Sequence, residues 1–246
     1  DVKKRNLLNS IEKEIAILQE IDHPNIIKVK ESFEIQNDIN DEFIVIIMEY
    51  CEQGDLLTMA TKHKFKKEAQ LKTILIEFLQ SIRYLHNRGI SHGDIKSENI
   101  LLSKNSAKLC DFGYCRTTFL VGDESKNGTL YYAAPELFHK GQFNPFKADI
   151  YAIGITLYSL FELQFPFKDG NQNYIVRQIA SGNLSLRRNM NKKLKVLIRK
   201  CTNIDPQSRP TIEEIINDEF FDLENKKTNK NNNLVQRTLF IENEQK

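Results

Sequence analysis

Apolar residues recur at two different periods along the chain, and helical spacing dominates after residue 55. Near the start they stand three or four positions apart, at Leu7, Ile11, Ile15, Leu18 and Ile21. This spacing predicts an amphipathic helix over 7–21, and Pro24 ends it. Segments 26–35 and 43–48 are rich in β-branched and aromatic residues, and each predicts a strand.

A long amphipathic helix is predicted where seven apolar residues share one face: Leu71, Ile74, Leu75, Phe78, Leu79, Ile82 and Leu85. It ends near Gly89, because glycine commonly stops a helix. Short strands are predicted at 100–102 and 108–110. Residues 148–161 are apolar on nearly all sides, which indicates a helix buried in the centre of the larger part. Shorter helical patterns follow at 172–181, 192–201 and 211–217.

Composition limits the classes of protein that the chain can belong to. With 246 residues, 40% of them hydrophobic, it can form one domain or a two-lobed one. The net charge of +2 predicts neither a nucleic-acid partner nor an anionic membrane surface. Its longest apolar run, 43–48, is too short to span a bilayer. The segment 223–246 is rich in Asn and Lys and predicts a disordered tail.

The cysteines point to an intracellular protein. They are Cys51, Cys110, Cys115 and Cys201, and their spacing matches neither a zinc site nor a disulfide framework. This favours a reducing compartment. With no targeting signal recognised, we expect a cytoplasmic or nuclear location.

Three motifs, in a fixed order, carry the chemistry. His92-Gly-Asp-Ile-Lys-Ser-Glu-Asn99 is the densest polar cluster, and Asp111-Phe-Gly113 and Ala134-Pro-Glu136 follow it. Together they resemble the H-R-D, D-F-G and A-P-E motifs of eukaryotic-type protein kinases. Lys96, two residues after Asp94, is typical of the Ser/Thr branch of that family, as is Gly128-Thr129.

The resemblance implies an α+β, protein-kinase-like two-lobed fold, with a truncated small β-rich lobe and a mainly helical large lobe. Residues 1–51 would be the remnant of the small lobe, comprising a helix, two strands and the hinge. Residues 52–222 would form the large lobe with the catalytic and activation loops. The tail, 223–246, would lie outside both lobes.

The resemblance also implies catalytic roles. Asp94 would orient the substrate hydroxyl and accept its proton, and Lys96 would stabilise the transferring phosphate. Asn99 and Asp111 would hold Mg²⁺ ions. Thr129 would bridge Asp94 and Lys96 through hydrogen bonds. For Asp94 or Asn99 taken alone, an ordinary solvated turn is the better explanation. For Thr129 the alternative is a plain loop threonine.

Other positions match the family's nucleotide site. Backbone groups of Glu49 and Cys51 would bond the adenine of ATP, Leu101 would pack under it, and Asp55 would reach the ribose. For Asp55 a simple turn-forming role is equally compatible with the sequence. Glu14 lies on the apolar stripe of its helix, where a carboxylate needs a cationic partner, and in the family that partner is a lysine of a neighbouring strand. The alternative for Glu14 is a solvated helix carboxylate.

Two further matches concern architecture. Asp149 resembles the family's aspartate that binds the backbone of the catalytic loop, and the alternative is capping of its own helix. Arg209 resembles the arginine that pairs with the glutamate of A-P-E, here Glu136. Glu98 and Asp55 could favour a basic residue upstream of the phosphorylated one by charge complementarity, or they could be solvated acids.

Two departures from the family pattern stand out. Gly93 replaces the arginine of H-R-D, so the cation that usually receives a phosphorylated activation loop is absent. Phosphorylation at Thr117, Thr118 or Ser125 should therefore matter little. In addition, no G-x-G-x-x-G occurs, and no lysine lies far enough upstream of Glu14. We therefore expect the 246 residues alone to be poorly active and dependent on further small-lobe strands.

The leading hypothesis is a protein Ser/Thr kinase that transfers the γ-phosphate of Mg-ATP to protein hydroxyls, with ATP and Mg²⁺ as cofactors and a protein as substrate. The alternative is a non-catalytic kinase-like scaffold or pseudokinase. A phosphotransferase acting on a small molecule is third, because Arg209 and the A-P-E segment are typical of protein kinases. No nucleic acid or membrane partner is expected, and the oligomeric state is left open.

Overall fold

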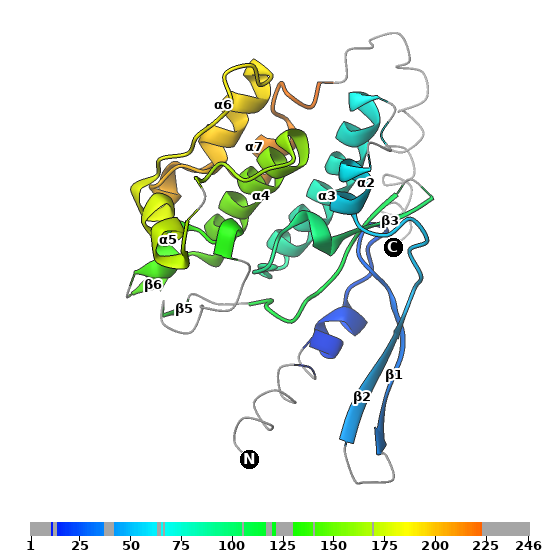
Figure 1. The fold of residues 1–246 in the computed structure, drawn as a ribbon. Helices are drawn as coiled ribbons and strands as arrows, with labels where there is room; N and C mark the ends of the chain where they lie inside the picture. Colours follow the sequence, from blue (N-terminus) through cyan, green and yellow to red (C-terminus); the bar gives the residue numbers. More distant parts are fainter. Residues whose placement is uncertain are drawn as a thin grey trace, which may run out of the picture.

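The computed structural model shows a small part, made of a helix and a hairpin, joined to a larger helical part (Figure 1). It describes residues 11, 14–36, 42–62, 65, 67–104, 106–116, 120–121, 130–139, 141–168 and 170–222. The predicted tail, 223–246, lies outside the described residues. Within the described ranges, no helix has the length and apolar character needed to cross a membrane.

Helix α4 (Pro145–Glu162) forms the centre of the larger part. It is buried along most of its length, as its uniformly apolar sequence predicts. Helix α6 (Lys192–Cys201) packs against it. Gly154 permits this close approach, because a Cβ at that position would lie 2.7 Å from Cγ2 of Thr202.

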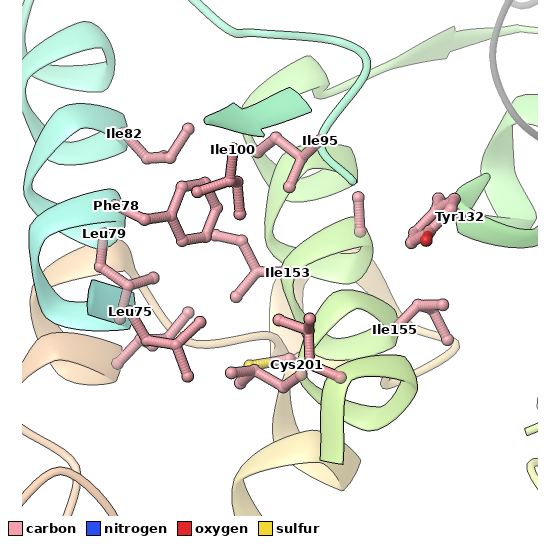
Figure 2. Close-up of a cluster of buried hydrophobic side chains, with 14 of the residues drawn as sticks. Leu75, Phe78, Leu79, Ile82, Ile95, Ile100, Tyr132, Ile153, Ile155 and Cys201 are labelled. Atoms are coloured by element: carbon pink, nitrogen blue, oxygen red, sulfur yellow. The ribbon is translucent and has the colours of Figure 1, made fainter. Parts of the chain in front are cut away.

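Helix α3 (Glu68–Asn87) supplies a second wall of the core, and α7 (Ile212–Ile216) packs against it. Figure 2 shows side chains of α3, among them Phe78, pointing toward Ile153 of α4. Both side chains are almost completely buried. Burying a side chain of this size contributes about 1.5–3 kcal/mol, so the contact between these helices stabilises the larger part. The predicted end of this helix near Gly89 is also confirmed, because Gly89 follows α3 with a left-handed φ of 71°.

A two-stranded antiparallel sheet lies beside α3. Its strands are β3 (Ile100–Ser103), which covers the predicted 100–102, and β4 (Ser106–Leu109), which begins two residues earlier and ends one residue earlier than the predicted 108–110. Helix α5 (Gln172–Ser181) also matches its predicted range. The strand pair places the residues before β3 next to those after β4, so the first two kinase-like motifs meet.

The small part contains a helix and a hairpin. Residues 14–20 are helical, which confirms the predicted helix over the part described. Strands β1 (Val29–Gln36) and β2 (Glu42–Met48) pair antiparallel and extend away from the large part (Figure 1). The hairpin therefore forms a sheet of its own.

The first predicted strand begins at β1 rather than at residue 26, because the residues before it pair elsewhere. The Ile27 amide donates to the Leu109 carbonyl oxygen at 2.9 Å, and the Leu109 amide donates to the Asn25 carbonyl oxygen at 2.8 Å. Ile26 and Ile27 are buried. This segment fastens the small part to the end of β4.

Some short elements were not predicted. They are α2 (Leu56–Thr61), the strand pair β5 (Leu120–Val121) and β6 (Gln142–Phe143), and single 3₁₀ turns at Ser97–Asn99, Leu130–Tyr132, Pro135–Phe138 and Pro206–Ser208. Each spans six residues or fewer, too short for a period of apolar residues to be read. The observed architecture confirms the predicted α+β class.

Candidate active site

The loop between α3 and β3 is held by one buried carboxylate. Oδ2 of Asp149, on α4, accepts the backbone amide of His92 at 2.8 Å, and its Oδ1 accepts that of Gly93 at 2.9 Å. Nε2 of His86, near the end of α3, lies 2.9 Å from the same Oδ2. The prediction that Asp149 binds the loop backbone is confirmed. The capping alternative is wrong, because the N-cap of α4 is Asn144.

His92 joins this loop to the segment that follows β4. Its Nε2 lies 3.1 Å from the carbonyl oxygen of Cys110, while its Nδ1 accepts the amide of Asp94 at 3.3 Å. The ring packs edge-on against Phe112 at 5.2 Å between centroids. Burial lowers the pKa of His92 despite the nearby Asp149, so a neutral ring that donates from Nε2 fits both contacts. No role beyond the motif was predicted for His92.

Gly93 adopts a backbone conformation that suits glycine, with φ at 82°. A Cβ at this position would lie within 2.4 Å of the carbonyl oxygen of Tyr114, the residue after Asp-Phe-Gly. Next to it, Ser91 and Arg116 exchange backbone hydrogen bonds of 2.9 and 3.1 Å. The glycine that replaces the arginine of H-R-D therefore allows the two motif segments to lie in contact.

Four polar side chains converge where these segments meet. Nζ of Lys96 donates to Oδ2 of Asp94 at 2.5 Å. Nδ2 of Asn99 lies 2.9 Å from the Asp94 carbonyl oxygen, 3.2 Å from its Oδ2, and 3.5 Å from Oδ2 of Asp111. Asp111 itself has a left-handed φ of 65°, which is uncommon for a residue with a Cβ and is frequent at functional sites.

The electrostatics of this cluster favour an ionised lysine. Burial alone would lower the pKa of Lys96, but the hydrogen bond and negative charge of Asp94 outweigh it, and the pKa is raised. Asp94 is 5% exposed. A nearly buried carboxylate beside a fixed cation can orient a hydroxyl group and keep a positive charge close to it.

The N-terminal helix brings Glu14 to the same site. Its Oε1 accepts the backbone amide of Phe112 at 3.1 Å, and its Oε2 faces Gly113. Burial raises the pKa of Glu14; the amide of Phe112 opposes the shift and the charge of Asp111 adds to it. Among the described residues the carboxylate meets a backbone amide, whereas the sequence led us to expect a cation.

The predicted nucleotide-contacting residues lie along one strip beside β3. The amide of Gln53 donates to the Leu102 carbonyl oxygen at 3.1 Å, and Asp55 forms a bridge with Leu101. The strip that contains Glu49 and Cys51 is thus fixed next to Leu101.

Two acids of this strip have side-chain partners of their own. Oε1 of Glu49 accepts the amide of Lys28 at 2.8 Å and Nζ of Lys108 at 2.9 Å. Asp55 is the N-cap of α2, because its Oδ1 accepts the amide of Thr58 at 2.8 Å. The turn-forming interpretation of Asp55 therefore describes its contacts in the structure.

The third motif is anchored by a buried ion pair. Both terminal nitrogens of Arg209 donate to the carboxylate of Glu136, at 2.6 and 2.7 Å. Its remaining donors meet carbonyl oxygens of Asn203 and Lys147. The predicted pairing of Arg209 with Glu136 is confirmed. A bidentate pair of this kind fixes orientation as well as charge.

Glu98, predicted to be either a binding acid or a solvated one, is engaged within the protein. Its Oε2 accepts the hydroxyl of Tyr132 at 3.1 Å and that of Ser97 at 3.0 Å. Burial raises the pKa of Tyr132 to about 12, so its hydroxyl remains a donor at neutral pH. Thr129 and the three candidate phosphorylation positions Thr117, Thr118 and Ser125 lie outside the described residues.

Comparison with known proteins agrees with this geometry. The family model described as the protein kinase domain matches residues 1–221. The chain belongs to the protein kinase family. Its predicted two-lobed kinase fold is confirmed by this match together with the hairpin and the helical part.

Several curated proteins are similar to this kinase chain. The serine/threonine-protein kinase kin-29 of Caenorhabditis elegans is 35% identical over 216 residues, which cover 86% of this chain and 25% of that protein. The serine/threonine-protein kinase Nek5 of Mus musculus is 32% identical over 216 residues, which cover 85% of this chain and 34% of that protein. The 3-phosphoinositide-dependent protein kinase B of Dictyostelium discoideum is 36% identical over 227 residues, which cover 89% of this chain and 24% of that protein. This kinase chain thus spans about a quarter to a third of the length of these relatives, two of which are named as serine/threonine kinases.

Proposed function

We propose that the chain acts as a protein Ser/Thr kinase that transfers the γ-phosphate of Mg-ATP to hydroxyl groups of a protein substrate. The observation that carries this proposal is the convergence of Asp94, Lys96, Asn99 and Asp111 within hydrogen-bonding reach of one another. Phosphoryl transfer depends mainly on positioning and on charge neutralisation. These four groups supply a carboxylate, a cation and oxygen ligands at one place.

Asp94 is the proposed base. Its Oδ2 is held by Lys96 and Asn99, so a substrate hydroxyl would meet a carboxylate in a fixed orientation and pass its proton to it. Lys96 would remain charged beside the transferring phosphate. Thr129 is proposed to bridge Asp94 and Lys96, as the family resemblance implies.

The residues present suit Mg²⁺. Nδ2 of Asn99 donates toward both carboxylates, which leaves its Oδ1 as the acceptor, and the carboxylate of Asp111 is exposed. Among the described residues, no group of three or more His, Cys, Asp or Glu forms a metal cage of its own. Mg²⁺ commonly uses one or two carboxylates together with substrate phosphates. When bound, it would neutralise phosphate charge.

The strip beside β3 is the proposed nucleotide site. Because the side chain of Glu49 is bound to Lys108, its backbone rather than its carboxylate is the group offered to adenine, together with that of Cys51. Leu101 is half-buried and would lie under the base. Asp55 would reach the ribose while it caps α2.

The same proposal covers organisation and location. We divide the chain into a small lobe over 1–51, a large lobe over 52–222 and a tail over 223–246. The four cysteines are free thiols, and burial raises the pKa of Cys110 to about 12. Unreactive free thiols suit a reducing cytoplasmic or nuclear compartment.

A kinase-like scaffold without phosphotransfer is the second candidate, and the contact of Glu14 bears on it. The carboxylate of Glu14 accepts the backbone amide of Phe112 at 3.1 Å. In an active kinase a lysine–glutamate pair is part of the catalytic arrangement. Activity of the whole protein separates the two candidates.

The test compares the full-length protein with Asp94→Asn and with Asp22→Asn as a matched control on the exposed surface. Magnesium-dependent transfer of labelled phosphate from ATP to Ser- and Thr-containing peptides is measured, with nucleotide binding measured separately. We expect Asp94→Asn to lower kcat about 10²–10⁴-fold with nucleotide affinity unchanged. Wild-type protein that binds the nucleotide and transfers nothing would establish the scaffold, and full activity of Asp94→Asn would remove the assigned role.

A further inference from the structure

A groove lies between the loop after α5 and the end of α6, at the edge of the large part farthest from the β1–β2 hairpin (Figure 1). Its volume is about 550 Å³, within the range of sites that hold a ligand or a short peptide segment. The loop over 181–186 forms one wall, and Arg199 with residues 202–204 forms the other. It is separate from the site proposed for catalysis.

The groove borders the most basic stretch of the chain. Residues 187–200 contain no acid and seven cations, namely Arg187, Arg188, Lys192, Lys193, Lys195, Arg199 and Lys200. Three of these pair with acids from other segments, Arg187 with Glu162, Lys193 with Glu219 and Lys200 with Asp218. The other four form no ion pair with any described residue. The local excess of positive charge contrasts with the net charge of +2 for the whole chain.

One of the unpaired cations of α6, Arg199, lines the groove. Lys192, Lys195 and Arg199 stand three and four residues apart and so share one stripe of the helix. Nζ of Lys195 donates to the carbonyl oxygen of Arg187, the residue that follows the loop wall, at 3.0 Å. Among the described lining residues Arg199 is the only charged one. A ligand of this groove should therefore carry negative charge.

Apolar surface lies within the same groove. Leu184 and Leu186 are half-buried in the loop wall, and Ile204 at the opposite wall is 51% exposed. No aromatic side chain is among the described lining residues. Bases of a single-stranded nucleic acid bind mainly by stacking on aromatic rings, so this lining suits an aliphatic side chain better than a base.

We propose that this groove docks an acidic segment of a partner protein, with an aliphatic residue against Leu184 and Ile204 and flanking carboxylates beside Lys195 and Arg199. Charge complementarity selects the partner, and the apolar walls fix the position of the segment. The proposal is independent of phosphotransfer, because none of these residues belongs to the catalytic cluster.

The experiment measures fluorescence anisotropy of a labelled peptide, Gly-Glu-Glu-Leu-Glu-Glu-Gly, with the full-length protein. We expect binding that weakens as salt is raised and falls about tenfold in the double variant Lys195→Ala/Arg199→Ala. The control Lys30→Ala/Lys62→Ala removes two exposed cations, one on β1 and one at the end of α2, and should bind as wild type does. Thermal unfolding of each variant verifies that it is folded.

Variants at Ile204 test the docking proposal a second time, without the removal of a cation. Because this side chain is half exposed, Ile204→Glu and Ile204→Lys should both fold, and we expect the first to abolish binding and the second to retain it. Replacing the peptide leucine with glycine should also weaken binding. Equal loss in the control double variant, or tighter binding of a single-stranded DNA of the same charge than of the peptide, would overturn the proposal.

Discussion

The large helical part and the β1–β2 hairpin differ in the kinds of side chain that they bury and expose. In the large part, charged and polar groups such as Asp149, Arg209 and His92 are at most 2% exposed and hold backbone segments in place. In the hairpin, apolar side chains such as Phe33 and Phe43 are 42% and 48% exposed. The geometry of the candidate site is therefore fixed by the large part, and the small part contributes Glu14 through its contact with Phe112.

The largest expected effect concerns the buried ion pair between Arg209 and Glu136 in the large part. Arg209→Ala leaves the carboxylate of Glu136, which is 13% exposed, without its bidentate partner. Removing one partner of a buried pair costs about 3–5 kcal/mol, and we expect urea denaturation to show a loss of that size in the free energy of unfolding. Arg83→Ala removes an arginine from a pair with Glu213 whose side chains are 39% and 52% exposed, and it should cost less than about 1 kcal/mol. Equal losses in the two variants would show that the buried pair of Arg209 and Glu136 contributes no more to the free energy of unfolding than an exposed pair does.

Gly93 gives a sharper test of how the two motif segments touch. Gly93→Ala adds the cost of a left-handed backbone, about 1–2 kcal/mol, and places a Cβ within 2.4 Å of the Tyr114 carbonyl oxygen. Gly54 is the matched control, because its φ is 76° and a Cβ there meets nothing within 4 Å. We expect urea denaturation to show a larger loss for Gly93→Ala than for Gly54→Ala, and phosphotransfer to fall only in the former. If the two variants lose equal stability, the close contact with Tyr114 does not constrain the fold.

The sequence predicted the long elements and the pairings that the motifs carry. Helix α4 was recognisable because it is apolar on nearly all sides, and the partner of Arg209 because the family motif includes it. The roles of His92 and Gly93 were not recognisable, since they depend on where Cys110 and Tyr114 lie in space. Elements as short as α2 have no measurable period. The partner of Glu14 was expected to be a cation, and among the described residues it is a backbone amide.

A smaller effect concerns the contact of the Glu14 carboxylate with the Phe112 amide, which joins the small part to the large one. Burial raises the pKa of Glu14, so its ionised form lowers stability at neutral pH, and this cost disappears as the pH falls through the raised value and the group takes up a proton. Glu14→Gln keeps an oxygen for the Phe112 amide and removes the charge. We expect a gain of less than about 1 kcal/mol at pH 7, because solvent screens a half-buried charge, and a smaller difference near pH 5, both measured by urea denaturation. Lower stability of Glu14→Gln at pH 7 would mean that a cation offsets the burial.

The smallest effect is expected on the hairpin itself. Phe43→Ser replaces a side chain that is about half exposed, and substitutions at such positions usually change stability by about 0.5 kcal/mol or less. Phe78→Ala, in the core between α3 and α4, should cost about 3–5 kcal/mol because it leaves a cavity. Thermal unfolding of both variants measures the contrast. If Phe43→Ser were as damaging as Phe78→Ala, the face of the hairpin would be covered in solution, and the small part would then be held as firmly as the large one.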